Sequence, residues 1–343
     1  MSQTNALKKK FRKPAFSSIA ITTILLFVGC ALFVPNSLSQ ISIEGMLPFA
    51  SILAIASIGQ TLVIQQRGID LSAAGVISIA AMAFGVMYSR WGFDPYVAAA
   101  ICLVGSIVIG AINGLLVAWL NVTPLVATLA MNSILFGFVQ VITGGAPAQT
   151  PEGLSTFVQG SFFGIPMLLV IATVSVLIMA LLASKTVLGR KFIAAGANPD
   201  AAKIGGVRTK PVLVLAYVTA SFTYGFAGML LAAYLQNVGV QVGNDYMLAV
   251  IATVIVGGTP LAGGKGTIIG SAIASIFMSQ LVQMVLTMGG PTSVQLLVQA
   301  ITIAIAATVQ GFTGRIKRKQ APTVIPNQID KTDTELISIH PIP

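Results

Sequence analysis

Long stretches without a charged residue are the feature that most constrains how this chain can fold. The longest, 95–151 and 266–314, are each long enough for one or two helices of about 20 residues that cross a bilayer. Their apolar residues are continuous rather than alternating, and lipid cannot satisfy open backbone groups, so the runs predict helices and not a barrel. With 55% apolar and 8% charged residues, the chain is predicted to be an all-α, polytopic integral membrane bundle.

Ten apolar segments are predicted to form membrane helices. They are 16–34, 46–65, 72–88, 96–120, 123–143, 164–184, 211–235, 246–257, 267–287 and 294–312. The eighth is short for a full crossing, and the second and third also fit one interrupted structure. The sequence therefore allows eight or nine crossings as well.

The basic residues predict which side each loop faces, because Lys and Arg are retained on the cytoplasmic side. With the N-terminus inside, seventeen of the 19 basic residues fall on the inner side, and the outer loops carry only Arg90. We therefore predict a multi-pass membrane protein with both ends cytoplasmic. Its parts are a basic N-terminus (1–15), a transmembrane domain (16–314) and a disordered tail (315–343). The net charge of +10 suits anionic membrane lipid, and its distribution by side argues against nucleic-acid binding.

One cytoplasmic loop, 185–210, holds six of the basic residues. Within it, Asn198 is placed to cap a helix that begins at Pro199, with Asp200 in the first turn where the helix dipole favours an anion. The helix is predicted to run over 199–204 and to stop at Gly205-Gly206, where left-handed geometry is easily reached. A solvated linker is the alternative interpretation, but the cap and the doubled glycine favour a helix that docks on a partner.

Two polar breaks interrupt the apolar pattern. The first, "TLVIQQRGIDLSAAG" at 61–75, fits either a lining of the solute path or a short turn at the inner surface. The second, "GGTPLAGGKGT" at 257–267, resembles a phosphate-binding loop but has neither the Walker nor the dinucleotide spacing. Its glycines are predicted to serve tight turning and close packing. Both breaks read as helix, break and helix, which indicates a weak internal repeat.

Groups for catalysis are sparse. The single histidine, His340, lies on the predicted tail, no cysteine or histidine cluster occurs, and no acidic residue is expected in the middle of a span. We therefore expect no catalytic residue, no metal site and no cofactor bound by this chain, and we do not expect proton coupling.

The predicted spans carry neutral hydrogen-bonding groups instead, which suit a small neutral solute. They are Gln60, Thr61, Asn113, Thr128, Asn132, Ser133, Gln140, Gln280, Gln283 and Gln295. The translocation path is predicted at Gln60, Asp70, Ser72, Asn113, Thr128 and Asn132. Interhelical hydrogen bonding is the alternative role for each of them. An ion-coupled secondary transporter or a passive channel remains the competing function.

Four strings occur in the order "GIDLSAAGVISIAA", "INGLLVAWLNVTPLVATLAMNSILFGFVQVITGG", "GRKFIAAGANPDAAKIGGVRTKPV" and "VIVGGTPLAGGKGTIIGSAI". Together they resemble the permease subunits of bacterial ribose-type ABC sugar importers, over roughly residues 43–310. The resemblance implies an all-helical subunit of the bacterial inner membrane that moves a sugar or similar small polyhydroxylated solute. It also implies a second permease, identical or different, two cytoplasmic ATPases that bind ATP and Mg²⁺, and a periplasmic solute-binding protein.

By the same resemblance, the helix at 199–204 looks like the coupling helix that docks on the ATPase. The coupling positions carried over are Gly196, Asn198, Ala201, Ala202, Gly205 and Val207. Two departures stand out: Arg67 precedes Gly68 where the family commonly has Gly-Gly, and Met247 and Ala249 follow Tyr246 where an acidic pair is usual. Because of these departures, the resemblance does not imply which solute is carried. They also make a second, non-identical permease chain plausible.

Overall fold

The computed structural model describes residues 16–319, with side chains for residues 16–310. The predicted basic N-terminus at 1–15, the tail beyond residue 319 and His340 lie outside the described residues. All ten segments predicted to be membrane helices are helical. They are α1 (Ser17–Phe33), α2 (Gln40–Gln65), α3 (Ala73–Ser89), α4 (Pro95–Ala118), α5 (Pro124–Thr143), α7 (Met167–Lys185), α10 (Thr209–Leu235), α11 (Asn244–Val256), α12 (Ile268–Thr287) and α13 (Thr292–Lys319).

Seven of these helices are long and apolar enough to cross a membrane, and α1, α3 and α11 are shorter apolar helices. This is a multi-pass, all-α membrane protein. Two helix boundaries differ from the prediction by more than three residues. Helix α2 begins six residues early, at Gln40, because the Ser39 hydroxyl caps it by accepting a hydrogen bond from the Ser42 N–H. Helix α13 continues to Lys319, past the predicted domain boundary at residue 314.

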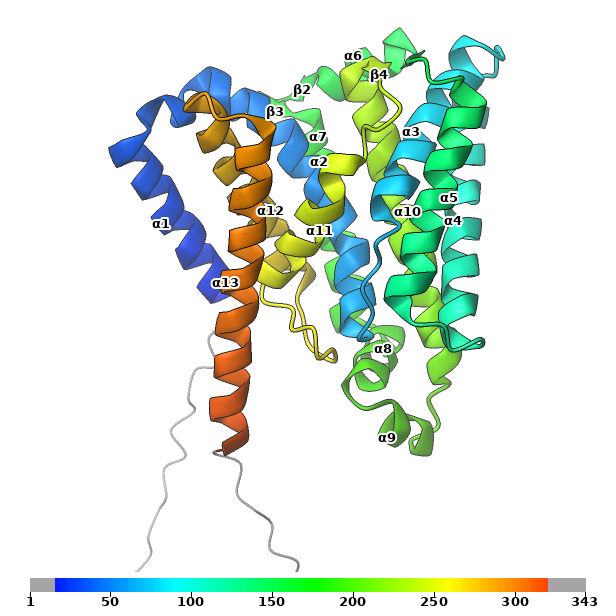
Figure 1. Ribbon diagram of the computed structural model, residues 1–343, viewed down its shortest axis with the longest axis vertical. Coiled ribbons are helices and arrows are strands. Elements are labelled where there is room, and N and C mark those ends of the chain that lie inside the picture. The colour runs from blue at the N-terminus through cyan, green and yellow to red at the C-terminus, as the bar shows by residue number, and fades with distance from the viewer. Residues whose placement is uncertain (1–15, 320–343) are drawn as a thin grey trace, which may run out of the picture.

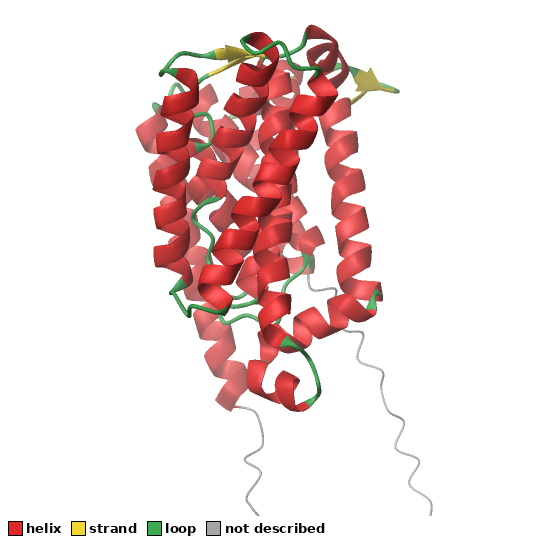
Figure 2. Ribbon diagram, turned by 90° about the vertical axis from the view of Figure 1, so that its right-hand side faces the viewer, coloured by secondary structure: helices red, strands yellow, loops and turns green. Residues whose placement is uncertain are grey.

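Smaller elements connect the long helices. They are the 3₁₀ helix η1 (Pro35–Leu38), α6 (Glu152–Gln159), α8 (Val187–Ala197), α9 (Pro199–Ile204) and four two-residue strands. Strand β1 (Ala148–Gln149) pairs antiparallel with β4 (Asn237–Val238), and β2 (Ser161–Phe162) pairs with β3 (Ile165–Pro166). Figure 2 shows these strands together at one end of the bundle.

Helix α2 lies at the centre of the bundle. It packs against α10, α12, α7 and α11. In its most apolar 18-residue stretch, 89% of the residues are buried. Helix α10 packs in turn against α4 and α3. In Figure 1, α4 and α5 form one side of the bundle, while α1 and α13 lie at the other. In the most apolar 18-residue stretch of α13, within residues 292–310, only 6% of the residues are buried, so this part of the helix is available for lipid or a partner subunit.

Both polar breaks lie between two helices, as predicted. Residues 66–72 join α2 to α3, and residues 257–267 join α11 to α12. In the second break, Gly263, Gly264 and Gly266 have positive φ angles, and a Cβ on Gly257 would lie 2.8 Å from Ser271 Cα. The predicted roles of these glycines in turning and close packing are confirmed.

Figure 1 shows the two ends of the bundle clearly. Helices α8 and α9 lie at the lower end, together with the start of α1 and the end of α13. Helix α6 and the short strands lie at the upper end. In the same view, the first break runs from the lower end of α2 back into the bundle before α3 begins.

Replacing Gly110 by Ala is expected to destabilise the bundle by about 1–3 kcal/mol, because α4 and α10 meet backbone to backbone at this residue. A Cβ at Gly110 would lie 2.5 Å from the Tyr217 carbonyl oxygen and 2.8 Å from Val218 Cα. Thermal unfolding in detergent measures the effect. The matched control is Gly105→Ala on the same helix, where a Cβ would meet nothing within 4 Å. Equal unfolding temperatures for the two variants would contradict this packing.

Candidate functional site

The break between α2 and α3 is held by buried polar side chains. Asp70 Oδ1 accepts hydrogen bonds from the Ser72 N–H (2.9 Å) and the Ser72 hydroxyl (2.6 Å). The Asn113 amide on α4 donates to the Ser72 hydroxyl at 3.0 Å. The Gln60 side-chain amide on α2 lies 2.6 Å from the Tyr224 hydroxyl on α10. With its oxygen and nitrogen exchanged, this amide also donates to the Asp70 carbonyl at 3.2 Å and accepts from the Asp70 N–H at 3.3 Å. The break is therefore anchored to three long helices.

Helix α5 holds the same break through the two remaining path residues. Thr128 Oγ1 accepts from the Leu71 N–H at 3.0 Å, and Asn132 Oδ1 accepts from the Gly75 N–H at 2.8 Å. All six residues predicted to form the path are thus brought into one interior network. Each is buried, and none lines the cavity described below. Their role in the path stays a prediction.

The sequence placed Asp70 at a break but did not show that its side chain is enclosed in the bundle. Its exposed fraction is 0%, and its Oδ2 has no hydrogen-bond partner among the described residues. The cause is the course of the break, which re-enters the bundle before α3 starts (Figure 1). The sequence shows where a helix is interrupted but not the depth at which the interruption lies.

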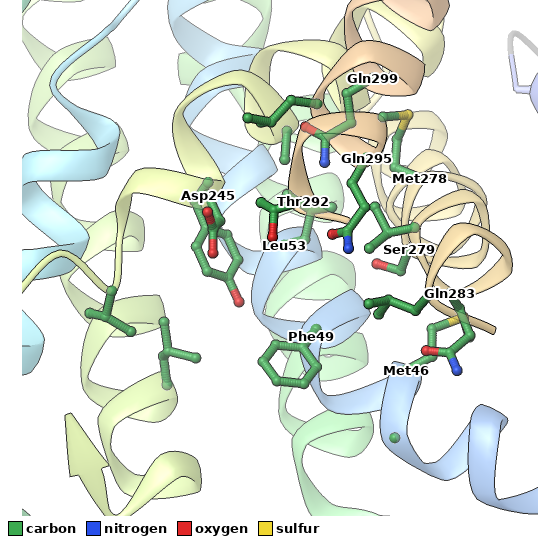
Figure 3. A pocket seen from close by; sticks show the side chains of 18 of the residues that line it. Met46, Phe49, Leu53, Asp245, Met278, Ser279, Gln283, Thr292, Gln295 and Gln299 are labelled. Atoms are coloured by element: carbon green, nitrogen blue, oxygen red, sulfur yellow. The ribbon is translucent and has the colours of Figure 1, made fainter. Parts of the chain in front are cut away.

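A cavity of about 430 Å³ lies in the opposite half of the bundle from α8 and α9. It is bounded by the start of α2, the ends of α10 and α12, the start of α11 and the start of α13. Its volume is typical of sites for small molecules. Figure 3 shows side chains from α2, α11, α12 and α13 converging around it.

The lining combines an apolar wall with neutral hydrogen-bonding groups. The apolar part includes Phe49, Leu53 and Met278. The polar side chains are Asp245, Tyr246, Ser279, Gln283, Thr292, Gln295 and Gln299. The Tyr246 hydroxyl and Gln299 Oε1 are buried without a hydrogen-bond partner in the described part of the chain, so both are free to bond a solute or water.

Sequence reasoning found this cavity only in part. Gln283 and Gln295 were among the neutral polar residues expected in spans, but neither was assigned to the path. Asp245, which precedes the helix predicted at 246–257, lies in the first turn of α11. A signal was present: Thr292, Gln295 and Gln299 are spaced by three and four residues, which places them on one face of α13. Of the departures from the family pattern, Ala249 lines the cavity and Arg67 lies at the junction of α2 with α8.

Helix α9 has the predicted bounds and the predicted cap. Asn198 Oδ1 accepts from the N–H groups of Asp200 and Ala201, both at 3.1 Å. At the other end, Gly206 adopts a φ of 79°, its N–H donates to the Lys203 carbonyl, and the Val207 N–H donates to the Ala202 carbonyl. These two bonds close the helix as a Schellman motif, so both ends of α9 are fixed locally.

The residues predicted for coupling, on α9 and at the end of α8, differ in how exposed they are. Ala202 and Gly196 are buried, whereas Ala201 and Gly205 are exposed. Next to them Ile204, which was not predicted, is 90% exposed. The end of this capped helix therefore presents an apolar side chain on the surface of the protein. Whether these residues couple to an ATPase is not decided by the geometry and stays a prediction.

Helix α8 was missed in the sequence, where the loop 185–210 was given a single helix. Thr186 caps its start, because the Thr186 hydroxyl accepts a hydrogen bond from the Gly189 N–H at 3.1 Å. It carries both Arg190 and exposed apolar residues such as Leu188. Such a mixed surface is typical of a helix at the membrane boundary.

Residues 42–307 match the family described as "Branched-chain amino acid transport system / permease component". A fructose import permease protein of Bifidobacterium longum is 30% identical over 93% of this chain and 96% of its own length. A galactose/methyl galactoside import permease protein of Haemophilus influenzae is 34% identical, covering 69% and 76%. A ribose import permease protein of Bacillus subtilis is 33% identical, covering 82% and 88%. No solved structure matches the chain.

Proposed function

Because the chain belongs to the family of membrane permease components described for branched-chain amino acid transport systems, we propose that it is the membrane-spanning subunit of an ATP-driven importer. Its cargo is a sugar or a similar small polyhydroxylated solute. The observation that carries the proposal is the arrangement of the two ends: an exposed, capped helix with Ile204 at one, and a polar-lined cavity at the other. A partner that moves α9 can thereby act on a solute path without meeting the solute.

The partners follow from this division of labour. Two ATPase subunits dock on the loops of two permeases, this chain and an identical or a different one. A solute-binding protein delivers the cargo at the cavity end. This chain supplies the solute path and the helix α9 on which an ATPase acts, but it does not hydrolyse ATP. ATP and Mg²⁺ are therefore held by the ATPases.

The lining of the cavity favours a neutral cargo over an amino acid. The relatives named above are import permeases for fructose, galactose and ribose, whereas the family description names branched-chain amino acids. An amino acid carries both a positive and a negative charge, and burying each requires an opposite partner. Among the residues that the structure describes, Asp245 is the one charged side chain that lines the cavity, and no Lys or Arg lines it. Amide and hydroxyl groups instead match the hydroxyls of a sugar.

The proposed orientation puts α8, α9 and both chain termini in the cytoplasm of a bacterial cell, with the domain boundaries predicted above. The positions of the basic residues support it. Lys203 on α9 is exposed, and the two native cysteines, Cys30 and Cys102, are buried. A Lys203→Cys variant should therefore react with an impermeant maleimide in inside-out vesicles but not in intact spheroplasts. The opposite pattern would rule out this orientation.

Purification from native membranes tests the central assignment. Mild detergent extraction of the tagged chain should recover an ATPase and a second permease, or a second copy of this chain. The matched control is the same chain with Ala201→Asp and Gly205→Asp, which introduces charge on the exposed side of α9. Recovery of no ATPase with the unaltered chain would contradict the assignment.

Asp70 is the one buried acid in the described chain that favours the ion-coupled alternative, since buried acids in membranes often carry protons. We expect it to be structural. Asp70→Asn keeps an oxygen for the two bonds from Ser72 and should retain ATP-driven uptake, whereas Asp70→Ala should destabilise the protein by about 1–3 kcal/mol. Uptake and thermal unfolding measure the two effects. Loss of uptake in a stably folded Asp70→Asn variant would support proton coupling instead.

A further inference from the structure

Three segments that are distant in the sequence meet beside α9. They are the end of α2 with the first two residues of the first break (65–67), the end of α8 (196–197) and the glycine turn of the second break (263–264). The Gly264 N–H donates to the Gln65 carbonyl at 2.8 Å, and the Gln66 amide donates to the Phe192 carbonyl at 2.9 Å. We call this meeting point the α2–α8 junction.

The junction is packed without spare room. A Cβ at Gly196 would lie 2.1 Å from the Gln65 carbonyl oxygen, and one at Gly264 would lie 2.4 Å from Ala197 Cα. A Cβ at Gly263 would lie 2.4 Å from Arg67 Cγ. Each segment therefore touches another through a glycine, and a displacement of one cannot be absorbed by a gap.

Arg67 links the junction to α9. Its φ angle is 65°, which is uncommon for a residue with a side chain. From this position its Nε donates to the Gly196 carbonyl at 2.9 Å, and its second guanidinium nitrogen donates to the Ala197 carbonyl. These are the last two carbonyls of α8, where the helix dipole favours a cation. The next residue, Asn198, caps α9, so Arg67 holds the base of the exposed helix.

We propose that Arg67 is a positioning residue that transmits the movement of α9 to both polar breaks, and through them to the cavity. The inference rests on the proposed function, because it needs a partner that moves α9. On one side, Arg67 itself belongs to the first break, which Asp70 and Ser72 anchor to α4. On the other, its stem lies against Gly263, whose turn joins α11 to α12. The far ends of both helices line the cavity.

The experiment measures the accessibility of the cavity while the nucleotide bound to the ATPases is changed. Thr292 lines the cavity and is exposed, so Thr292→Cys reports its accessibility to an impermeant maleimide. The buried native cysteines should contribute little background. The assembled complex, in lipid nanodiscs, is labelled with ADP and then with ATP and vanadate. The labelling rate of the otherwise unaltered chain should change several-fold between the two states.

Arg67→Met keeps an apolar stem against Gly263 and removes the donors. We expect it to reduce the nucleotide-dependent change about three- to tenfold, with assembly and basal ATP hydrolysis retained. Arg67→Lys keeps the charge and should restore part of the change. The matched control is Arg90→Met. Arg90 likewise donates to backbone carbonyls, those of Thr143, Ala146 and Pro147 just beyond α5, but at the end of the bundle away from α9.

The outcomes separate the two proposals. An unchanged labelling response in Arg67→Met would overturn the inference and leave the proposed function standing. An equal loss in Arg90→Met would also overturn it, because the effect would then be general. If neither Arg67 variant assembles, the contact serves folding and the inference fails. No nucleotide response in the unaltered background would contradict the proposed function itself.

Discussion

Replacing Ile204 by Asp is expected to abolish solute uptake while leaving the bundle folded. The side chain is 90% exposed on a helix whose two ends are closed by their own hydrogen bonds. It therefore contributes little to the stability of the isolated chain. In a complex it is the apolar group best placed to enter a pocket on the ATPase, where a central residue typically contributes about 2 kcal/mol or more. An aspartate there must also lose its hydration.

The expected loss of uptake is at least about tenfold, with a matching loss of ATPase from the purified complex. Ile204→Leu is the matched control, because it keeps an apolar side chain of the same size and should retain both properties. Thermal unfolding of the isolated chain should be unchanged in both variants. Normal uptake by Ile204→Asp would show that α9 does not dock on the motor through this residue.

The second large effect is expected at the cavity. Replacing both Gln283 and Gln295 by Met removes hydrogen-bonding groups and keeps side-chain length and flexibility. Each hydrogen bond to a neutral group contributes about 1 kcal/mol, and a polar solute group left without a partner costs about 1–3 kcal/mol more. Uptake should therefore fall about tenfold or further. Docking of the ATPase and its basal hydrolysis should persist, because both residues lie at the end of the bundle away from α9.

The matched control for the cavity variant is Gln140→Met. Gln140 lies exposed on α5 and does not line the cavity, so the same chemical change there should leave uptake intact. Equal uptake by the cavity variant and this control would place the solute path elsewhere. The buried network of Gln60, Asn113 and Asn132 would then be the next place to search.

Local signals in the sequence predicted the local structure well. Helix α9 could be placed to the residue because a cap, a proline and two glycines are close neighbours in the chain. The ten apolar helices could be placed because lipid requires continuous apolar runs. Helix α8 was missed because its cap, Thr186, follows directly on the end of α7 and resembles a continuing loop.

What the sequence could not give is the convergence of distant faces. The cavity needs five helix ends to meet, and no local pattern states which ends do so. The glycines at 263 and 264 were recognised as close-packing residues, but their partners, Arg67 and Ala197, lie far away in the chain. Likewise Asp70 was identified as polar and at a break, yet its depth depends on where α3 starts within the fold.

Uptake by proteoliposomes that contain the purified complex tests the central claim most directly. The vesicles hold ATP and Mg²⁺ inside, the solute-binding protein with radiolabelled D-ribose, D-galactose or D-fructose is added outside, and ionophores abolish every ion gradient. The account predicts accumulation of one of these sugars that requires ATP and fails with a non-hydrolysable analogue. Accumulation that persists without ATP and disappears when the ion gradients are removed would contradict it.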